Sequence, residues 1–484
     1  MKNQELLKEA INLHLSGKNT KAIEVYKKIL ISEPSNLIAL NNFASLLNTI
    51  NKHKEAKILL KQALKIKPDY FDALNNLGIS MKLSKEYLEA INIFKSLLKL
   101  KPNFVKALIN WGNCLQSLKK FEKALDIYDK ALNIEPNSVE VLYNKGTCLN
   151  ELNLQDKAAI IYNKILMLDS NFVEAKWNLA LIQLLQGNYV DGWKNHEIRK
   201  KREKTKKDYI NLLENKSWLG KKKLAEKTIY IFSEQGLGDY IQFCRYLPML
   251  KNLGAKIILN TPKTLDRIIK TLNIEYTHIN DLKKLEFDYN CPLMSLPLAF
   301  NTELHTIPNQ IPYLFTPKDK IAYWGKKLGS KIKKRIGLMW SGNPQYENDH
   351  NRSIYLEKLT EFFDLPFEFH SLQIDYNKFD LKLLKKYKNL ICHQKDELLG
   401  FDNTAGLIES MDLIISVDTA IAHLSGALNK PVWLLLPFTP DYRWLLNRND
   451  SPWYPSMKLY RQTKKNDWDT IIKKVRKDLQ NFNI

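Results

Sequence analysis

The sequence lacks the features that mark a membrane-spanning or secreted protein. No apolar run approaches the roughly 18–20 residues that a membrane helix needs. Residues 1–10 have no signal-peptide apolar core. The five cysteines are scattered, without the paired spacing of a zinc site. We therefore expect the cysteines to be reduced core residues of a cytoplasmic protein.

Acidic residues are outnumbered by basic ones, which gives a net charge of +22. The lysines are mixed with acidic residues along the repeats, as on a solvated face. Dense basic runs occur only at residues 199–207 and 221–223. We therefore do not expect nucleic acid as the partner. Binding of an anionic substrate or leaving group explains a few of these basic residues better.

Three residue types repeat with a period of 34 residues in the first two-fifths of the chain. The period is typical of the helix–turn–helix unit of tetratricopeptide repeats. The repeating positions are Pro34, Pro68, Pro102 and Pro136; Ala22, Ala56, Ala90, Ala124 and Ala158; and Asn42, Asn76, Asn110, Asn144 and Asn178.

Each repeat contains two amphipathic stretches separated by a short turn and ended by the proline, which cannot continue a helix. Small residues recur where helices must approach closely, as at Gly78, Gly112 and Gly146. About five full units and a degenerate sixth unit are expected, because single helix pairs bury their apolar face only by stacking. The sequence predicts an α-solenoid over residues 1–205.

The repeated asparagines have two interpretations. They can be structural, since tetratricopeptide repeats commonly carry asparagine at this position. They can also bind an extended peptide backbone, because an amide has both donors and acceptors. The array resembles the superhelix of O-GlcNAc transferases, where such a ladder grips the acceptor protein. The resemblance implies a protein or peptide partner, and both interpretations remain open.

Beyond about residue 224, short apolar runs alternate with helical patterns, which favours parallel sheets. Strands are expected at residues 228–232, 256–260, 275–278 and 287–290, and then at 336–340, 367–373, 390–393, 413–417 and 432–436. Two such series predict twin Rossmann-like lobes over residues 206–325 and 326–484. Ligands are expected beyond the carboxyl ends of the strands.

The first strand runs into a turn with two glycines, Gly236 and Gly238, followed by Asp239. Glycines permit a tight turn and close approach to the backbone. A simple helix cap explains the aspartate but not both glycines. A dinucleotide fingerprint fits poorly, because Ile241 stands where the third glycine would be.

A second strand-to-helix turn contains Asp418, Thr419 and Ala420, with His423 one turn into the helix. The start of this helix predicts an anion site suited to a diphosphate. A lone histidine is otherwise often structural. Arg352, in a polar loop after residue 340, is a candidate phosphate clamp, although a plain surface loop is the alternative.

Longer stretches carry a family resemblance. Residues 234–239, with residues 242–243 and 245–248, resemble the N-terminal loop of the heptosyltransferase-type (family nine) glycosyltransferases that are fused to tetratricopeptide repeats in bacteria. Residues 417–419, with residues 422–428, resemble the sugar-nucleotide loop of that family. Residues 452–457 and 461–462 resemble the C-terminal signature of the repeat-fused subgroup.

The resemblance implies a GT-B fold and transfer of a sugar from a nucleotide-diphosphate donor, a co-substrate rather than a cofactor. Asp239 matches the proposed base, and Asp418 matches an aspartate that contacts the donor sugar. Thr419, Ala420 and His423 match the diphosphate site, and Arg352 a weaker phosphate contact. Gln373 lies where a nucleoside contact is expected, although glutamate is more usual there.

The sequence thus predicts a metal-independent, inverting glycosyltransferase whose repeat array presents an acceptor, with no metal site. No Asp-x-Asp metal motif lies near the expected cleft. Two alternatives remain. One is a non-catalytic scaffold for protein–protein interaction, and the other is a transferase acting on surface glycan or lipid.

Overall fold

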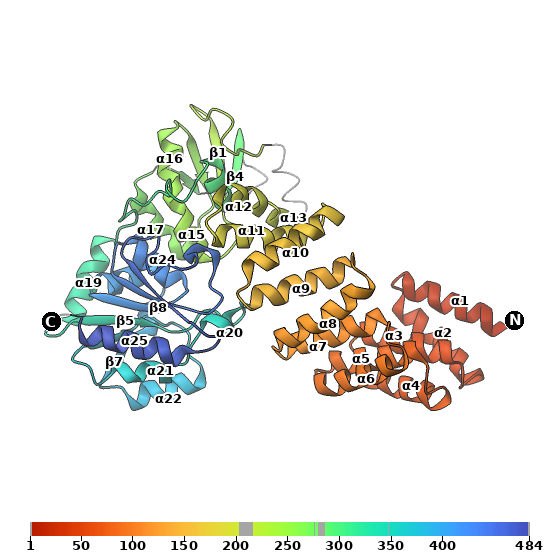
Figure 1. Ribbon diagram of the computed structural model, residues 1–484. Helices are drawn as coiled ribbons and strands as arrows, with labels where there is room; N and C mark the ends of the chain where they lie inside the picture. Colours follow the sequence, from red (N-terminus) through yellow and green to blue (C-terminus); the bar gives the residue numbers. More distant parts are fainter. Residues whose placement is uncertain (1, 203–215, 275, 279–285, 347, 483–484) are drawn as a thin grey trace. The chain divides into compact units, whose positions relative to one another are not determined.

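The computed structural model describes residues 2–202, 216–274, 276–278, 286–346 and 348–482 (Figure 1). The chain forms two compact units, Met1–Ala175 and Lys176–Ile484. The first unit is helical and the second is α/β, which confirms the expected fold class. The expected end of the repeat array at residue 205 lies outside the described residues.

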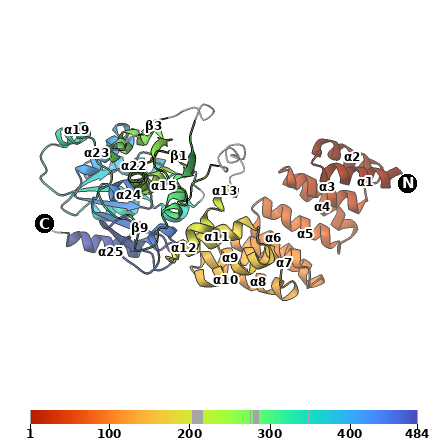
Figure 2. The same ribbon diagram turned by 90° about the horizontal axis from the view of Figure 1, so that it is seen from above.

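The first unit is a stack of antiparallel helix pairs (Figure 2). Lys67, Lys101 and Glu135, each one residue before a proline, follow the last residue of the second helix in a pair. The helices are α1(Lys2–Leu15), α2(Asn19–Ser32), α3(Leu37–Thr49), α4(His53–Ile66), α5(Phe71–Leu83), α6(Tyr87–Leu100), α7(Val105–Ser117), α8(Phe121–Ile134), α9(Val139–Glu151) and α10(Gln155–Leu168).

Small residues allow the helices of a pair to touch. The recurring alanines, from Ala22 to Ala158, are all fully buried. A Cβ built on Gly112 would lie 2.3 Å from Cε1 of Tyr128, and Gly78 and Gly146 face Phe94 and Tyr162 in the same way. Each glycine therefore makes room for an aromatic ring of the next helix, which accounts for its spacing.

The second unit contains two entirely parallel sheets. The first sheet has the order β3-β2-β1-β4, from β1(Thr228–Phe232), β2(Lys256–Leu259), β3(Tyr276–His278) and β4(Tyr289–Pro292). The second has the order β10-β9-β8-β5-β6-β7, from β5(Arg335–Met339), β6(Glu368–Ser371), β7(Ile391–His393), β8(Leu413–Val417), β9(Val432–Leu436) and β10(Met457–Arg461).

Helices cover both faces of the second sheet (Figure 1). These helices are α19(Lys318–Leu328), α21(Leu356–Leu359), α22(Lys378–Lys386), α23(Phe401–Glu409), α24(Ala420–Ala427) and α25(Trp468–Gln480), while the short α20(Asp349–Arg352) belongs to the connection after β5. Side chains alternate between the two faces. On β9, Leu434 belongs to one core cluster, whereas Trp433 and Leu435 belong to another that includes Ile472 and Val475 of α25.

The order of each sheet reverses at one point. In the first sheet the chain proceeds from β1 to β2 and β3 on one side, then crosses to β4 on the other. In the second sheet the reversal lies between β5 and β8. In open parallel sheets this is where ligands bind. The loops after β1, β5 and β8 are the three that the sequence singled out.

The last helices of the repeat pattern are part of the second unit. α11(Val173–Leu185), α12(Tyr189–His196) and α13(Arg199–Arg202) follow the repeats, and the division between the units falls inside α11. Trp193 of α12 is 2% exposed and belongs to the core cluster that contains Phe243 and Trp453. The terminal helices therefore share a hydrophobic core with the sheets.

Several details differ from the sequence predictions. The helical segment after β1 begins at Leu237, before Asp239, as α15(Leu237–Phe243), and is interrupted by a 3₁₀ turn before α16(Leu247–Asn252). β10 was not predicted. The expected lobe boundary at residue 325 lies inside α19. Glu275, in one expected strand, is outside the described residues.

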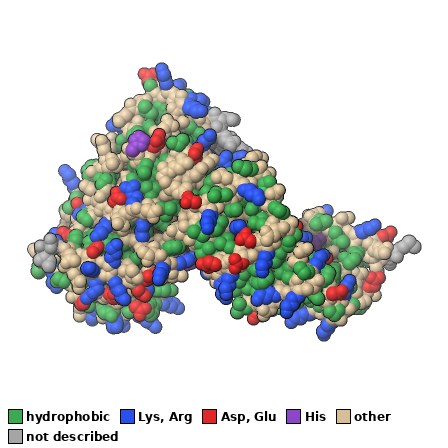
Figure 3. Space-filling model, in the orientation of Figure 1, with side chains coloured by type: hydrophobic (Ala, Val, Ile, Leu, Met, Phe, Trp, Pro, Cys, Tyr) green, Lys and Arg blue, Asp and Glu red, His purple; other side chains and the backbone are tan. Residues whose placement is uncertain are grey.

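The cysteine prediction is only partly correct. Cys114, Cys148, Cys244 and Cys291 are buried, unpaired thiols, but Cys392 is exposed. The reason is that Cys392 lies on β7, the edge strand of the second sheet. In the described residues, no helix has the length and apolarity needed to cross a membrane. On the face shown in Figure 3, Lys and Arg are interspersed with Asp and Glu.

The contact at Gly112 gives a stability prediction. We expect Gly112→Val to destabilise the first unit by about 2–3 kcal/mol, because the buried ring of Tyr128 must shift. Urea unfolding followed by circular dichroism measures the change. The control is Gly325→Val, since a Cβ there meets nothing within 4 Å. Equal stability of both variants would contradict the packing role.

Candidate active site

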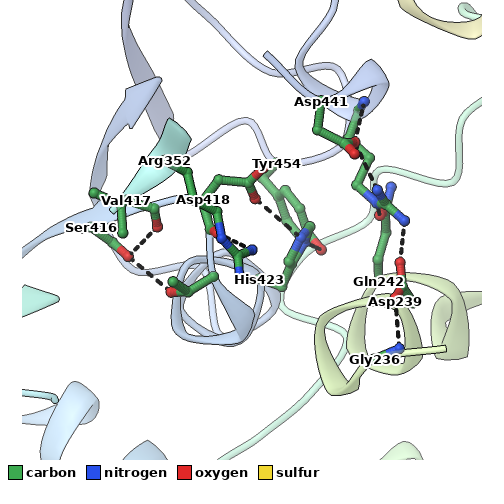
Figure 4. Close-up of polar contacts among 12 residues, drawn as sticks. Gly236, Asp239, Gln242, Arg352, Ser416, Val417, Asp418, His423, Asp441 and Tyr454 are labelled. Carbon is green, nitrogen blue, oxygen red and sulfur yellow. Dashed lines mark hydrogen bonds and ion pairs between the residues drawn. The ribbon is translucent and has the colours of Figure 1, made fainter. Parts of the chain in front are cut away.

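The loop after β1 brings Asp239 into the first turn of α15. Oδ2 of Asp239 accepts a hydrogen bond of 2.9 Å from the backbone N–H of Gly236 (Figure 4). A Cβ on Gly238 would lie 3.0 Å from Cδ2 of His423 and 3.5 Å from Cα of Ala420. Gly238 therefore lets the first turn of α15 touch the first turn of α24, one element from each lobe.

The loop after β8 supplies Asp418 and Thr419, and α24 begins at Ala420. Nη1 of Arg352 donates a hydrogen bond of 2.7 Å to the backbone oxygen of Asp418. Nε of Arg352 donates to Oδ1 of Asp349 at 3.0 Å. The structure thus brings Arg352 and Asp418 together, although the two lie 66 residues apart in the sequence.

Asp418 has an unusual acidity. Burial and the negative charge of Asp441 raise its pKa to about 6, although Arg352 and Arg443 act in the opposite direction. Its side chain is 15% exposed. A carboxyl with such a pKa changes charge near neutral pH, and perturbed pKa values of this kind are frequent in functional sites.

His423 is almost completely buried and holds a network together. Its Nδ1 lies 3.0 Å from the hydroxyl of Tyr454, and its ring stacks on Trp444 at 5.3 Å. Burial and the nearby arginines hold its pKa well below the usual range, so the ring is neutral. Its contact with the sugar-nucleotide donor stays a prediction. A neutral imidazole would contribute a hydrogen bond to that donor rather than a positive charge.

Gln373 follows β6 and is also buried. Its Oε1 accepts a hydrogen bond of 3.2 Å from the backbone N–H of Ser341, and its Nε2 donates to the backbone oxygen of Asp375 at 3.0 Å. Gln373 therefore fixes the loop that follows β5. The predicted nucleoside contact stays a prediction.

Arg443, which the sequence patterns did not single out, connects the two lobes. Nη2 of Arg443 contacts Oδ1 of Asp239. Nε donates to Oε1 of Gln242 at 2.6 Å, and Nη1 to Oδ1 of Asp441 at 2.7 Å. The sequence does contain a feature that points to Arg443. An Asp–Tyr–Arg–Trp run at residues 441–444 follows β9 at the same sheet edge.

A second buried arginine anchors the loop after β1. Nη2 of Arg199, in α13, donates to Oε2 of Glu234 at 2.8 Å and to Oγ of Ser295 at 2.6 Å. Nη1 of Arg199 donates to Oε1 of Glu197 at 2.6 Å. Because Glu234 precedes Gly236 by two residues, the last helices of the repeat pattern hold the base of the Asp239 loop.

The asparagine ladder makes hydrogen bonds between neighbouring repeats. Nδ2 of Asn76 donates to Asn41 at 2.8 Å, and Nδ2 of Asn144 donates to Asn113 at 3.1 Å. Oδ1 of Asn110 accepts from Lys82 at 2.8 Å. The amide of Asn42 accepts from Asn41, and Asn178 lies in the part of α11 that belongs to the second unit. These bonds fit the structural interpretation and leave the peptide interpretation untested.

Comparison with known families confirms the two expected parts. Tetratricopeptide repeat models match residues 37–70, 105–138 and 139–172. The model of glycosyltransferase family 9 (heptosyltransferase) matches residues 391–469. Protein FlbA of Caulobacter vibrioides is 23% identical over an alignment of 340 residues, and the match covers 63% of this chain and 54% of FlbA. The chain thus spans about half the length of this relative.

Two solved structures are similar to a minority of the chain. A thermophilic tetratricopeptide repeat protein of Thermus thermophilus has a TM-score of 0.34 and 17% identity, covering 38% of this chain and 99% of its own. PilF of Pseudomonas aeruginosa has a TM-score of 0.37 and 19% identity, and the match covers 44% of this chain and 98% of PilF.

The chain therefore joins tetratricopeptide repeats to a region that matches a glycosyltransferase family. In particular, residues 391–469 match the model of family 9, the heptosyltransferase type. The matched segment contains Asp418, His423 and the newly found Arg443. Asp239 and Arg352 lie outside it. In the described ranges, no cluster of three or more His, Cys, Asp or Glu is arranged to hold a metal ion.

The raised pKa of Asp418 predicts a pH-dependent stability. Its folded-state pKa of about 6 exceeds the ordinary value of 3.8, so the carboxyl costs stability progressively as the pH rises through that range. We expect Asp418→Asn to stabilise the protein by about 2–3 kcal/mol above pH ~7 and to have no such effect near pH ~4. Thermal unfolding across this pH range measures it.

Asp412, just before β8, provides the opposite case. Burial raises its pKa, but Lys331 and the backbone N–H of Arg335 outweigh burial and lower it. Asp412→Asn should therefore destabilise the protein at neutral pH. The same direction of change for both variants would contradict this account of Asp418.

Proposed function

We propose that the protein is a glycosyltransferase that moves a sugar from a nucleotide-diphosphate donor to a hydroxyl of an acceptor bound by the repeats. The observation that carries the proposal is the meeting of two loops. Gly238, next to Asp239 in the loop at the switch point of one sheet, packs against the first turn of α24, at the switch point of the other. The candidate base and the candidate anion site thus come from adjoining turns of the two lobes.

The reaction is a single displacement at the anomeric carbon of the sugar. The acceptor oxygen forms a bond to this carbon, and the bond from the carbon to the diphosphate oxygen breaks. The hydroxyl proton passes to Asp239, and the nucleoside diphosphate leaves with the bonding electron pair. A single displacement inverts the configuration.

The leaving diphosphate needs positive charge and N–H donors. The first turn of α24 supplies free backbone N–H groups and the positive end of the helix dipole. Arg352, held against Asp418, supplies a guanidinium beside this turn. Preorganised donors of this kind stabilise the charge that develops in the transition state, and this proposal involves no metal ion or cofactor.

The repeats are proposed to hold a protein or peptide acceptor. Asn76 and Asn144 use their Nδ2 atoms between repeats. Among the described residues, their Oδ1 atoms accept no hydrogen bond and can receive one from a peptide N–H. The ladder can therefore keep the repeats in register and still contact a chain.

Nucleotide binding and product analysis test the proposal. Thermal unfolding with UDP, GDP and ADP should show stabilisation by at least one nucleotide, and the corresponding sugar donors should be turned over. Comparison of cellular proteins with and without this chain by mass spectrometry should reveal a glycopeptide. No response to any nucleotide would favour the scaffold alternative, and transfer to glycan or lipid alone would remove the protein acceptor.

Asp239 gives a direct test of the base. Asp239→Asn should lower the transfer rate by about 10²–10⁴-fold, because an amide cannot accept the acceptor proton. Initial rates with the donor found above measure it. Glu303→Gln, which neutralises a carboxylate that is 51% exposed in the same lobe, is the control and should keep the wild-type rate. A wild-type rate in Asp239→Asn would remove Asp239 from the base role.

A further inference from the structure

Arg443 is a buried cation shared by carboxylates of the two lobes. Its side chain is 9% exposed and contacts Asp239 of α15 and Asp441, which lies two residues before it. A buried charge persists only when it is paired and hydrogen-bonded. The three contacts of Arg443 leave one N–H on each terminal nitrogen without a partner among the described residues.

In this arrangement both carboxylate oxygens of Asp239 are already engaged by other groups. Oδ1 contacts the guanidinium of Arg443, and Oδ2 accepts the N–H of Gly236. A cation in direct contact favours the ionised form of a carboxylate and so weakens it as a proton acceptor. An acceptor hydroxyl would have to compete with Arg443 for Oδ1.

The same guanidinium lies close to the expected position of the donor. Gly238, next to Asp239, touches Ala420 at the start of α24. Arg443 and Arg352 both act electrostatically on Asp418, which directly precedes Thr419 and α24. A diphosphate at this turn would therefore lie within reach of a guanidinium that has N–H groups to spare, and phosphate oxygens match the planar guanidinium fork.

We propose that Arg443 is a donor-operated switch: it pairs with Asp239 when the site is empty and turns to the diphosphate when the donor binds, which frees Asp239 to act as the base. The inference rests on the proposed function and deepens it. It gives the reaction an order, because the donor must arrive before the acceptor hydroxyl can be activated.

The charges around Asp239 support this direction of change. Burial, the largest influence, and the charge of Asp441 raise the pKa of Asp239 above its ordinary value, although Arg443 and the N–H of Gly236 act to lower it. Removal of Arg443 from Oδ1 leaves burial and Asp441 in place, so Asp239 becomes a stronger base. The facing residue across Gly238, His423, is neutral and adds no opposing charge.

A double-mutant cycle on nucleotide binding tests the switch. The probe is the nucleoside diphosphate, UDP, GDP or ADP, that stabilises the full-length protein, with its Kd measured by calorimetry. We expect Asp239→Asn to bind this diphosphate more tightly, by at least about fivefold, because no carboxylate holds Arg443 back. Arg443→Gln should bind it more weakly, and Arg443→Lys should restore part of the loss.

The coupling between the two positions is the decisive quantity. In the Arg443→Gln background, Asp239→Asn should lose most of its effect, whereas a long-range charge effect would survive there. Circular dichroism and thermal unfolding verify that each variant is folded. If Arg443→Gln does not fold, Arg443→Lys takes its place in the cycle.

Two outcomes separate this inference from the proposed function. If the wild type binds a diphosphate and Asp239→Asn binds it equally well or more weakly, the switch is overturned. The glycosyltransferase proposal then remains intact. Absence of binding by the wild type and by Asp239→Asn for all three nucleotides overturns both.

Discussion

A guanidinium buried where two lobes meet must be matched by carboxylates, and this requirement at Arg443 organises the site. Asp239 comes from the first lobe, and Asp441 and Arg443 come from the second. These ion pairs compensate the charge of Arg443 only while the two lobes stay in contact at this position. Removal of one partner leaves the remaining charged groups buried and unpaired. The close contact of Gly238 with α24 depends on the same position.

A similar constraint connects the end of the repeat pattern to the sheets. Arg199 lies in α13, but its carboxylate partner Glu234 precedes the glycines of the Asp239 loop. Trp193 of α12 packs edge-on against Phe243 of the first lobe and Trp453 of the second. The terminal helices therefore complete the core of the second unit rather than simply ending a solenoid, and this explains why the compact division falls inside α11.

Periodic features of the fold were well predicted from the sequence. The 34-residue period located the helix pairs, and five strands of the second sheet were expected within a few residues of their observed bounds. β10 was missed because residues 457–461 include Lys458 and Arg461, which break the apolar run. In the structure β10 is an edge strand, so polar side chains can point to solvent.

The candidate site was predicted less completely than the fold. Motifs located Asp239, Asp418 and Arg352, because glycines and helix starts have recognisable local patterns. Arg443 was missed because its importance comes from a contact across 204 residues. The ligand contacts of Gln373 and His423 stay predictions based on their positions, and the structure adds that both side chains bond protein groups.

The sequence by itself determined the period, the change from helices to alternating strands and helices, and the two strand-to-helix turns. These are local properties, set by side-chain spacing and backbone freedom. Only the tertiary structure decided that Arg443 pairs with Asp239, that His423 is neutral and that Asp418 titrates near pH 6. Charge state and pairing depend on burial and on neighbours distant in the chain, and both are fixed only when the two lobes pack.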